Sequence, residues 1–295
     1  MSDLPPPPAI DVVVVTGEQP AKVAAMLEDA GLPDDRFALT ILCGDPAPLG
    51  PGGPRGCRVF HFAGESVFHL RRRLPAVARK DAGWVVLMED HNALDPSWKR
   101  AVLDATGATE ATGCRLVIGA VENNTSTGFW SWAHFLHTFA FHWAPRIAEP
   151  RSPIVANIAM RRGALGTDAL ELGQFETLLL PSLLAGSRLD AGFPVDHVQH
   201  RNALQSTIAH FDNGRVTGAF LADHHPKARK HALRHARHVL LSRPLAIVRI
   251  LARHPHRSRV PALTPLAVVW LAACHAAGTL VGAFAGFGRA PWRLE

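Results

Sequence analysis

Three consecutive side chains that can bind a metal ion, Glu89, Asp90 and His91, follow an apolar run that begins at Trp84. The run has the length and the β-branched content of a buried parallel strand, and residues 95–98 supply an N-cap and a first-turn proline for a following helix. Because open α/β sheets bind ligands beyond the carboxyl ends of their strands, we expect these side chains at the rim of a cleft. A capped, solvated turn is the alternative interpretation.

The sequence lacks the motifs that mark several other kinds of α/β active site. The turn after the first expected strand, residues 16–19, contains neither GxGxxG nor GxxxxGK[ST], which argues against a dinucleotide oxidoreductase and a P-loop hydrolase. The chain has no GxSxG elbow, which argues against an α/β-hydrolase. The chemistry that remains is the acidic turn, residues 89–91, with a second carboxylate about 85 residues further on, at Glu171 or Glu176.

Alternating apolar strands and amphipathic helices predict an α/β fold with a mostly parallel sheet flanked by helices. In the first half, strands are expected at 10–16, 37–43, 58–62 and 84–88, with helices at 19–30 and from 66 to about 80. In the second half, strands are expected at 114–121, 154–160 and 193–200, with helices at 129–143 and 171–185. From residue 205 the pattern is helical to the end of the chain and is interrupted by prolines.

The order of these features resembles the family 2 glycosyltransferases of the GT-A fold, in the bacterial branch whose acidic motif reads Glu-Asp-His. The resemblance runs from about residue 10 to residue 225 and depends on the order and spacing of several short pieces. Those pieces are Leu42-Cys43-Gly44-Asp45, the acidic turn with Pro96 and Trp98, Asn157 to Arg162, Phe175-Glu176-Thr177, Ala185-Gly186 and His200.

The resemblance implies a site for a nucleotide sugar. Asp45 would contact the base or the ribose, and the acidic turn would hold a divalent cation that bridges the donor's diphosphate. Oxygen ligands suit Mg²⁺ or Mn²⁺, and an imidazole in the set favours Mn²⁺. The full set of residues that the resemblance implies for binding the nucleotide sugar is Asp45, Glu89, Asp90, Asn157, Arg161 and Arg162.

The resemblance also implies a general base, a carboxylate that takes the proton from the acceptor hydroxyl. Glu176 matches that position best, and Glu171 is the second candidate. Thr177 stands where the family usually has an aspartate. An acceptor role is considered for Trp130 and Trp132, because aromatic faces stack on sugars and lipid chains. His200 is considered as a further acceptor contact that reaches the active site, and an ordinary strand-end histidine is the alternative interpretation. Packing in the core is the more common role of an aromatic helix.

The positive charge of the chain is confined to one segment. Residues 227–259 contain ten Lys/Arg, five His and no Asp or Glu, whereas residues 1–226 contain 19 Lys/Arg and 24 Asp/Glu. The apolar stretch 265–287 follows and is long enough to cross a bilayer or to lie in its interface. This combination predicts an anionic membrane surface as a partner. His231, His235 and His238 have the helical spacing of metal ligands, but no acid or cysteine accompanies them, and this absence favours the membrane-facing surface over a metal site.

We therefore expect three parts: a proline-rich N-terminus (1–9), a GT-A domain (10–225) and membrane-associated C-terminal helices (226–295). Four scattered cysteines without CxxC spacing, and no signal sequence, fit the cytosolic side of the membrane. The predicted activity is inverting, metal-dependent hexosyl transfer from a nucleotide sugar to an envelope or lipid-linked glycan, at the cytoplasmic face of the inner membrane. A non-catalytic membrane-associated protein with a degenerate GT-A fold is the main alternative. Nucleic-acid binding by residues 227–259 ranks last, because that segment has few aromatic residues.

Overall fold

The computed structural model describes residues 9–17, 20–44, 56–109, 112–124, 128–145, 155–224 and 228–294. The chain divides into two compact units: unit 1 comprises residues 1–122 and 149–196, and unit 2 comprises residues 123–148 and 197–295. Residues 197–225 belong to unit 2, and the domain boundary expected at residue 225 stays a prediction.

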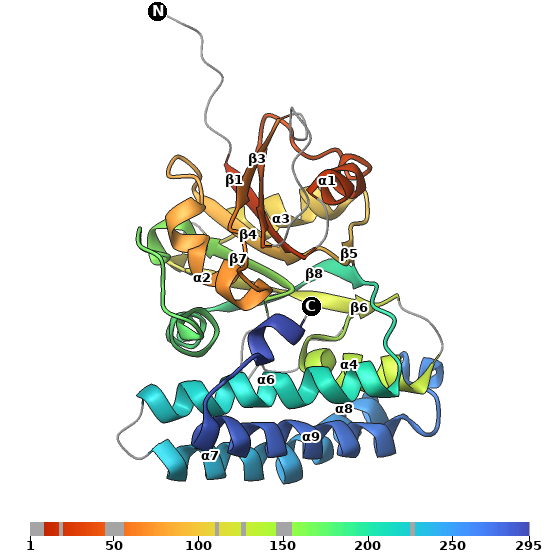
Figure 1. Ribbon diagram of the computed structural model, residues 1–295. Helices are drawn as coiled ribbons and strands as arrows, with labels where there is room; N and C mark the ends of the chain where they lie inside the picture. The colour runs from red at the N-terminus through yellow and green to blue at the C-terminus, as the bar shows by residue number, and fades with distance from the viewer. Residues whose placement is uncertain are drawn as a thin grey trace, which may run out of the picture. The chain divides into compact units, whose positions relative to one another are not determined.

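An eight-stranded sheet in the order β3-β2-β1-β4-β7-β6-β8-β5 forms the centre of unit 1 (Figure 1). Its strands are β1 (Ile10–Thr16), β2 (Phe37–Cys43), β3 (Cys57–His61), β4 (Trp84–Glu89), β5 (Asn92–Ala93), β6 (Leu116–Asn123), β7 (Asn157–Arg161) and β8 (Arg188–His197). The sheet is parallel across β3, β2, β1 and β4. Strand β7 is antiparallel to both of its neighbours, β4 and β6.

The central strands form because their residues are apolar, β-branched and buried on both faces of the sheet. All seven residues of β1 and all seven of β2 are buried, as are the first five of β4. Continuous apolar runs of this kind are typical of parallel strands that helices cover on both sides. The α/β sheet flanked by helices that the sequence predicted is therefore confirmed.

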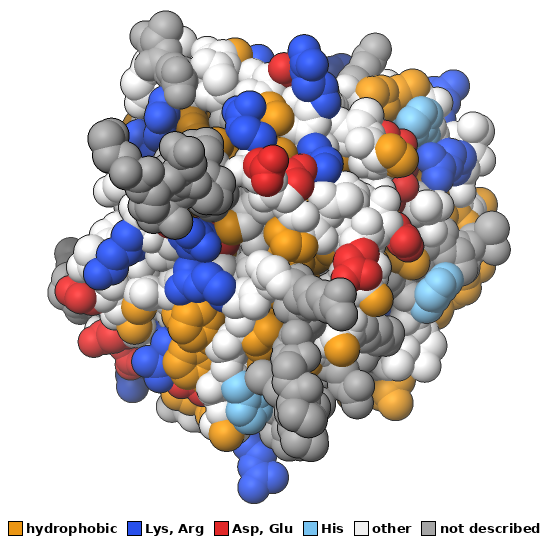
Figure 2. Space-filling view, turned by 90° about the horizontal axis from the view of Figure 1, so that it is seen from above, with side chains coloured by type: hydrophobic (Ala, Val, Ile, Leu, Met, Phe, Trp, Pro, Cys, Tyr) orange, Lys and Arg blue, Asp and Glu red, His pale blue; other side chains and the backbone are white. Residues whose placement is uncertain are grey.

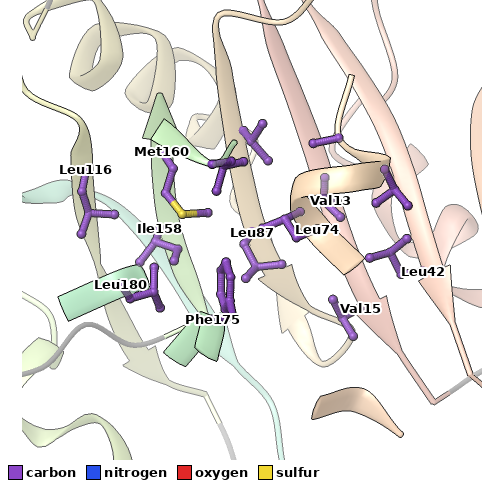
Figure 3. Packing of buried hydrophobic residues seen from close by; sticks show 14 of the residues in the cluster. Val13, Val15, Leu42, Leu74, Leu87, Leu116, Ile158, Met160, Phe175 and Leu180 are labelled. Atoms are coloured by element: carbon purple, nitrogen blue, oxygen red, sulfur yellow. The ribbon is translucent and has the colours of Figure 1, made fainter. Parts of the chain in front are cut away.

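The helices and short helical turns of unit 1 are α1 (Pro20–Glu28), α2 (Val67–Val77), α3 (Trp98–Gly107), η3 (Arg162–Ala164), η4 (Phe175–Leu179) and α5 (Leu180–Leu183). One hydrophobic cluster joins α2 and η4 to the sheet: Leu74 lies near Val13 and Leu87, and Phe175 lies beside Leu87 (Figure 3). Burial of each such side chain contributes roughly 1.5–3 kcal/mol. Phe175 thus attaches η4, the turn that also contains Glu176, to the sheet.

The helix expected over residues 171–185 is shorter and less regular in the structure. Gly173 has a φ of +81°, a left-handed conformation that ends a regular helix and that glycine adopts without strain. A π-helical turn, η4, follows at Phe175–Leu179, and α5 adds four residues. The chain is therefore helical only after Gly173.

Unit 2 is helical. Its helices are α4 (Phe129–Phe139), η2 (Ala140–His142), α6 (Ala203–His224), α7 (Ala228–Arg237), η5 (His238–Ser242), α8 (Arg243–Arg253), η6 (Arg257–Arg259), α9 (Thr264–Ala285) and η7 (Ala290–Arg293). Helices α6 and α9 lie side by side (Figure 1). A Cβ on Gly214 or Gly218 of α6 would clash with backbone carbonyl groups of α9. The two helix backbones can therefore approach this closely only because these positions are glycine.

Candidate active site

The acidic turn begins at the carboxyl end of β4, where the sequence placed it. Strands β1 and β4 pair in parallel with Val15 opposite Glu89, so the next residues, Thr16 and Asp90, are also neighbours. The Thr16 hydroxyl donates a hydrogen bond of 2.7 Å to Oδ2 of Asp90. Register between two central strands thus fixes the position of one carboxylate of the turn.

The imidazole of His91 lies between the two carboxylates of the turn. Its Nε2 is 3.1 Å from Oε2 of Glu89, and its Nδ1 is 2.9 Å from Oδ1 of Asp90. Burial alone would lower the pKa of His91, but the hydrogen bonds to Asp90 and Glu89 outweigh it and raise the pKa to about 9. Burial likewise opposes ionisation of Asp90, yet its hydrogen bonds with His91 and Thr16 leave its pKa below the usual value. At neutral pH His91 is therefore an imidazolium that lies between the side chains of Glu89 and Asp90.

This donor set fits a divalent cation. Oε2 of Glu89 and Oδ1 of Asp90 already converge on a single positive charge, and hard cations such as Mg²⁺ and Mn²⁺ bind carboxylate oxygens. His91 could join them as a ligand only after losing its proton, because metals bind neutral imidazole. The two carboxylates are therefore the first candidates for metal ligands, and His91 is a third that competes with a proton.

Arg71 connects the acidic turn to the predicted general base. Its Nη2 lies 2.7 Å from Oε1 of Glu89, and its Nη1 lies 3.7 Å from Oε1 of Glu176. All three side chains are largely buried, with 10%, 15% and 19% of Arg71, Glu89 and Glu176 exposed. One guanidinium thus brings together carboxylates that are 87 residues apart in the sequence.

Burial raises the pKa of Glu176, while the nearby guanidinium of Arg71 opposes that rise. Neither carboxylate oxygen of Glu176 has a hydrogen-bond partner in the described part of the chain. A buried carboxylate with a raised pKa and free acceptor positions can take a proton from a hydroxyl group. Glu171, by contrast, is exposed, and its carboxylate is 3.5 Å from the side-chain amide of Gln174.

Asn157 lies at the same edge of the sheet as the acidic turn but supports the fold. Strand β7 pairs Asn157 with Met88, the residue before Glu89. The buried Asn157 amide donates to the carbonyl oxygens of Ala120 and Phe193, at 2.9 and 2.7 Å, and so links β7 to β6 and β8. Both protons of this amide are used within the protein, which leaves only its carbonyl oxygen for a ligand.

The structure separates Arg161 and Arg162 from the acidic turn. Because β7 runs antiparallel to β4, Arg161 pairs with Trp84 at the opposite end of that strand, about 13 Å from the position of Met88 at the usual rise per residue. The guanidinium of Arg161 lies over the Trp84 ring at 4.6 Å. Arg162 donates to three backbone carbonyl oxygens, those of Pro75, Arg79 and Gly166. Nothing in the sequence indicated that β7 runs antiparallel to β4, and the role of Arg161 and Arg162 in binding the nucleotide sugar stays a prediction.

The remaining predicted residues lie elsewhere. Asp45 falls outside the described residues. Trp130, Trp132 and His200 belong to unit 2. There Trp132 is 3% exposed and meets Trp143 edge-on, with ring centroids 5.4 Å apart, as core packing predicts. Trp130 is half-buried and His200 is exposed, and their acceptor role stays a prediction.

Two residues of the site were not identified from the sequence, Arg71 and Thr16. Arg71 had a detectable signal: it sits beside Leu70 and one turn before Pro75, on the face of α2 that is buried. An arginine on the apolar face of an amphipathic helix is rarely buried without an acidic partner. Thr16 is the last residue of an otherwise apolar strand, which gives no comparable signal.

Comparison with known proteins finds solved structures that are similar to this chain at low sequence identity. No protein-family model and no curated protein matches the chain. Among solved structures, a mycobacterial protein is 15% identical, covering 66% of this chain and 68% of its own, with a TM-score of 0.38. Glucosyl-3-phosphoglycerate synthase from Mycobacterium tuberculosis, in complex with Mn²⁺, UDP-glucose and phosphoglyceric acid, is 16% identical over 66% of this chain and 73% of its own, also with a TM-score of 0.38. Similarity at this level does not indicate a function, so the function has to be inferred from the residues of this chain itself.

Proposed function

We propose that this protein is a metal-dependent glycosyltransferase that uses a nucleotide-sugar donor. The observation that carries the proposal is the Arg71 bridge, which unites the acidic turn with Glu176 at one end of the sheet. A cation site beside a buried carboxylate suits glycosyl transfer from a nucleotide sugar, because the cation can stabilise the leaving diphosphate and the carboxylate can take the proton of the acceptor. The family resemblance and the position at the carboxyl ends of parallel strands support the same function.

In this proposal Glu89 and Asp90 bind Mn²⁺ or Mg²⁺, with His91 as a further ligand once it is neutral. When bound, the cation offsets the negative charge that develops on the departing nucleoside diphosphate. Thr16 holds Asp90 in position through its 2.7 Å hydrogen bond, and Arg71 holds the other oxygen of Glu89. These two supporting contacts keep both carboxylates aimed at one point.

Glu176 acts as the general base. It takes the proton of the acceptor hydroxyl while that oxygen bonds to the anomeric carbon, and the bond from the anomeric carbon to the diphosphate oxygen breaks. Attack from the face opposite the leaving group inverts the anomeric configuration. The raised pKa of Glu176 makes it a better proton acceptor than an exposed carboxylate. Apart from the ion pair with Arg71, neither of its oxygens accepts a hydrogen bond in the described part of the chain, so one of them can take this proton.

The finer assignments are part of the same proposal. The donor is a nucleotide hexose, with Asp45 on the base or ribose, and the acceptor is an envelope or lipid-linked glycan. Trp130, Trp132 and His200 are the candidate acceptor contacts, and the location is the cytoplasmic face of the inner membrane. The apolar helix α9 supports a lipid-linked acceptor, because such an acceptor is presented at a membrane surface.

A panel of nucleotide sugars tests the proposal. Hydrolysis or transfer should be seen with at least one donor in the presence of Mn²⁺ or Mg²⁺, and should stop in excess chelator. Calorimetry on the same panel provides a readout without turnover, because the nucleoside diphosphate should bind only with the cation. The matched control is Asp104→Asn, which changes an exposed aspartate paired with Arg100 in α3. Metal-dependent binding without any turnover would favour the non-catalytic alternative.

A further inference from the structure

The exposed large hydrophobic side chains of this protein are concentrated in unit 2. Of the fifteen among the described residues, fourteen belong to unit 2 and one, Leu178, belongs to unit 1. The face in Figure 2 has the mixed character of an ordinary protein surface: Lys, Arg, Asp and Glu are interspersed, and the hydrophobic side chains lie in separate groups. A concentration of exposed apolar side chains on one part of a protein indicates a partner for that surface.

Helix α9 carries the longest exposed apolar stripe. Exposed residues recur along it at helical spacing: Leu266, Val269, Trp270, Ala277, Val281 and Phe284. Leu266 is 71% exposed and Phe284 is 67% exposed, and about 27 Å of helix separates them at the usual rise per residue. No Asp, Glu, Lys or Arg occurs between Thr264 and Ala285. The stripe is therefore apolar from end to end.

Length and composition alone would allow α9 to cross a membrane. It has 22 residues and a mean hydropathy of 1.8 over its most apolar 18-residue window, and half of that window is buried in the protein. The buried half packs on α6, where Gly278 and Gly282 of α9 face Phe211 and Arg215 so closely that a Cβ would clash.

Further contacts tie α9 and its flank to α6. The Trp270 indole donates a 2.9 Å hydrogen bond to Thr207, and Arg293 pairs at 2.6 Å with the buried Asp212. A bilayer crossing by α9 would either carry the charged residues of α6 into hydrocarbon or break this interface. The packing therefore favours a helix that presents one face to lipid while the other face stays on the protein.

The basic segment lies next to this stripe. Helix α7 packs against α9, and the guanidinium of Arg229 lies 5.2 Å from the ring centroid of Phe284. Lys230, Arg234 and Arg237 of α7 are exposed as well. Leu233 of α7 is exposed between these charges. On η5 and α8 the exposed large hydrophobic side chains are Leu240, Leu241, Leu245 and Val248. Exposed basic and apolar side chains thus share neighbouring helices.

We propose that this surface, formed by α7, η5, α8 and the exposed face of α9, docks on an anionic lipid bilayer with α9 lying in the interface. The apolar side chains would enter the boundary of the acyl chains, and the arginines would meet anionic headgroups. A second copy of the chain fits less well, because residues 227–259 carry ten basic side chains and no acid. Two such segments brought together would repel each other.

An anionic bilayer would be a partner of the proposed glycosyltransferase, and binding to it can be measured without any enzymatic turnover. The full chain is mixed with vesicles of phosphatidylcholine alone, or of phosphatidylcholine with phosphatidylglycerol, and separated by flotation. We expect flotation with the anionic vesicles and much weaker flotation with the neutral ones. Asp90→Ala should float like the wild type, so loss of the active site and loss of membrane binding give separate results.

Variants locate the surface. Arg234→Gln and Arg237→Gln should each weaken binding to anionic vesicles about fivefold, the effect of roughly 1 kcal/mol per basic residue near such a surface. Leu266→Glu should weaken binding to vesicles of both compositions. The matched controls in unit 1, Arg100→Gln and Leu178→Glu, should bind like the wild type. Because every substituted side chain is exposed, circular dichroism should show that all variants fold.

Three results would overturn the proposal. The first is a full chain that stays unbound with both kinds of vesicle. The second is protection of Arg289 and Arg293, which follow α9, from trypsin added outside sealed vesicles. A helix that crosses the bilayer would carry these two residues to the far side. The third is a dimer in light scattering that Leu266→Glu dissociates, which would make the occupant a second copy.

Discussion

The guanidinium of Arg71 lies 2.7 Å from the carboxylate of Glu89, although α2 and the end of β4 are separate elements. The same guanidinium reaches Glu176 at 3.7 Å. Arg71 is thus the residue that holds the acidic turn and Glu176 in a common position. Its loss should affect both carboxylates, whereas the loss of either carboxylate leaves the other with its partner.

Arg71→Met should therefore lower both stability and activity. Breaking a largely buried ion pair leaves uncompensated charge, and we expect a loss of about 1–3 kcal/mol in the free energy of unfolding. Urea unfolding measures that loss, and steady-state kinetics should show a fall of about tenfold or more in kcat/KM. Arg71→Lys keeps the charge and should retain part of both. The exposed control is Arg100→Met. If the two variants had equal stability and equal kcat/KM, the contacts of Arg71 with Glu89 and Glu176 would be unimportant.

Glu176→Gln should reduce turnover by about 10²- to 10⁴-fold, because it keeps the size of the side chain and removes its basicity. Binding of the nucleotide sugar should change little, since the amide can still occupy the same space. Glu171→Gln is the matched control, as Glu171 is exposed. If the Glu171 variant lost turnover and the Glu176 variant kept it, the role of base would pass to Glu171.

Asp90→Ala should abolish metal-dependent binding of a nucleoside diphosphate, because it removes one of two carboxylates that converge on the cation position. Thr16→Val should have a smaller effect in the same direction, since it removes one hydrogen bond worth about 0.5–1.5 kcal/mol. Titration calorimetry with Mn²⁺ and with chelator measures both. Tight binding by the Asp90 variant in chelator would place the nucleotide away from the acidic turn.

Unit 2 should lose stability as the pH falls below about 6.5. Burial lowers the pKa of His142 to about 4 and of His235 to about 4, with Arg243 opposing protonation of both, and burial holds the pKa of His137 and His210 well below the usual value. The folded state then binds fewer protons than the unfolded state, whose histidines titrate near 6.5, so stability rises with pH in this window.

The expected loss between pH 7.5 and pH 4.5 is of the order of 1–3 kcal/mol per buried histidine. Urea unfolding followed by tryptophan fluorescence measures it. His142→Gln and His235→Gln should each reduce the pH dependence, whereas His200→Gln, at an exposed position, should leave it unchanged. A stability that is flat across this pH range would mean that these histidines titrate alike in the folded and the unfolded state.

Gly214→Ala should destabilise unit 2 by about 1–3 kcal/mol, because the added methyl group would clash with the backbone of α9. The opposite sign is expected for Gly107→Ala in α3, where nothing lies within 4 Å of the new Cβ and alanine is the better helix former by up to about 1 kcal/mol. Thermal unfolding of the two variants beside the wild type provides the comparison. A stabilised Gly214 variant would show that α6 and α9 are not in close contact in solution.

The sequence by itself determined the local elements and the acidic turn. The strands at Ile10–Thr16 and Trp84–Glu89 follow from runs of apolar and β-branched residues. A continuous run of this kind predicts a strand that is buried on both faces. The position of Glu89 and Asp90 at the end of a strand follows in the same way, because they are the next residues along the chain. The basic segment and the apolar stretch after it are also properties of the sequence alone.

Tertiary structure decided which distant residues meet. The antiparallel direction of β7 moved Arg161 and Arg162 to the far end of β4, and no local pattern reports strand direction. The contacts of Arg71 with Glu89 and Glu176 depend on how α2 and η4 pack on the sheet. The composition of α9 allows either a crossing helix or a packed one, and its glycine contacts with α6 bury one of its faces. Such pairings depend on the free energy of packing between elements, which short-range residue patterns do not contain.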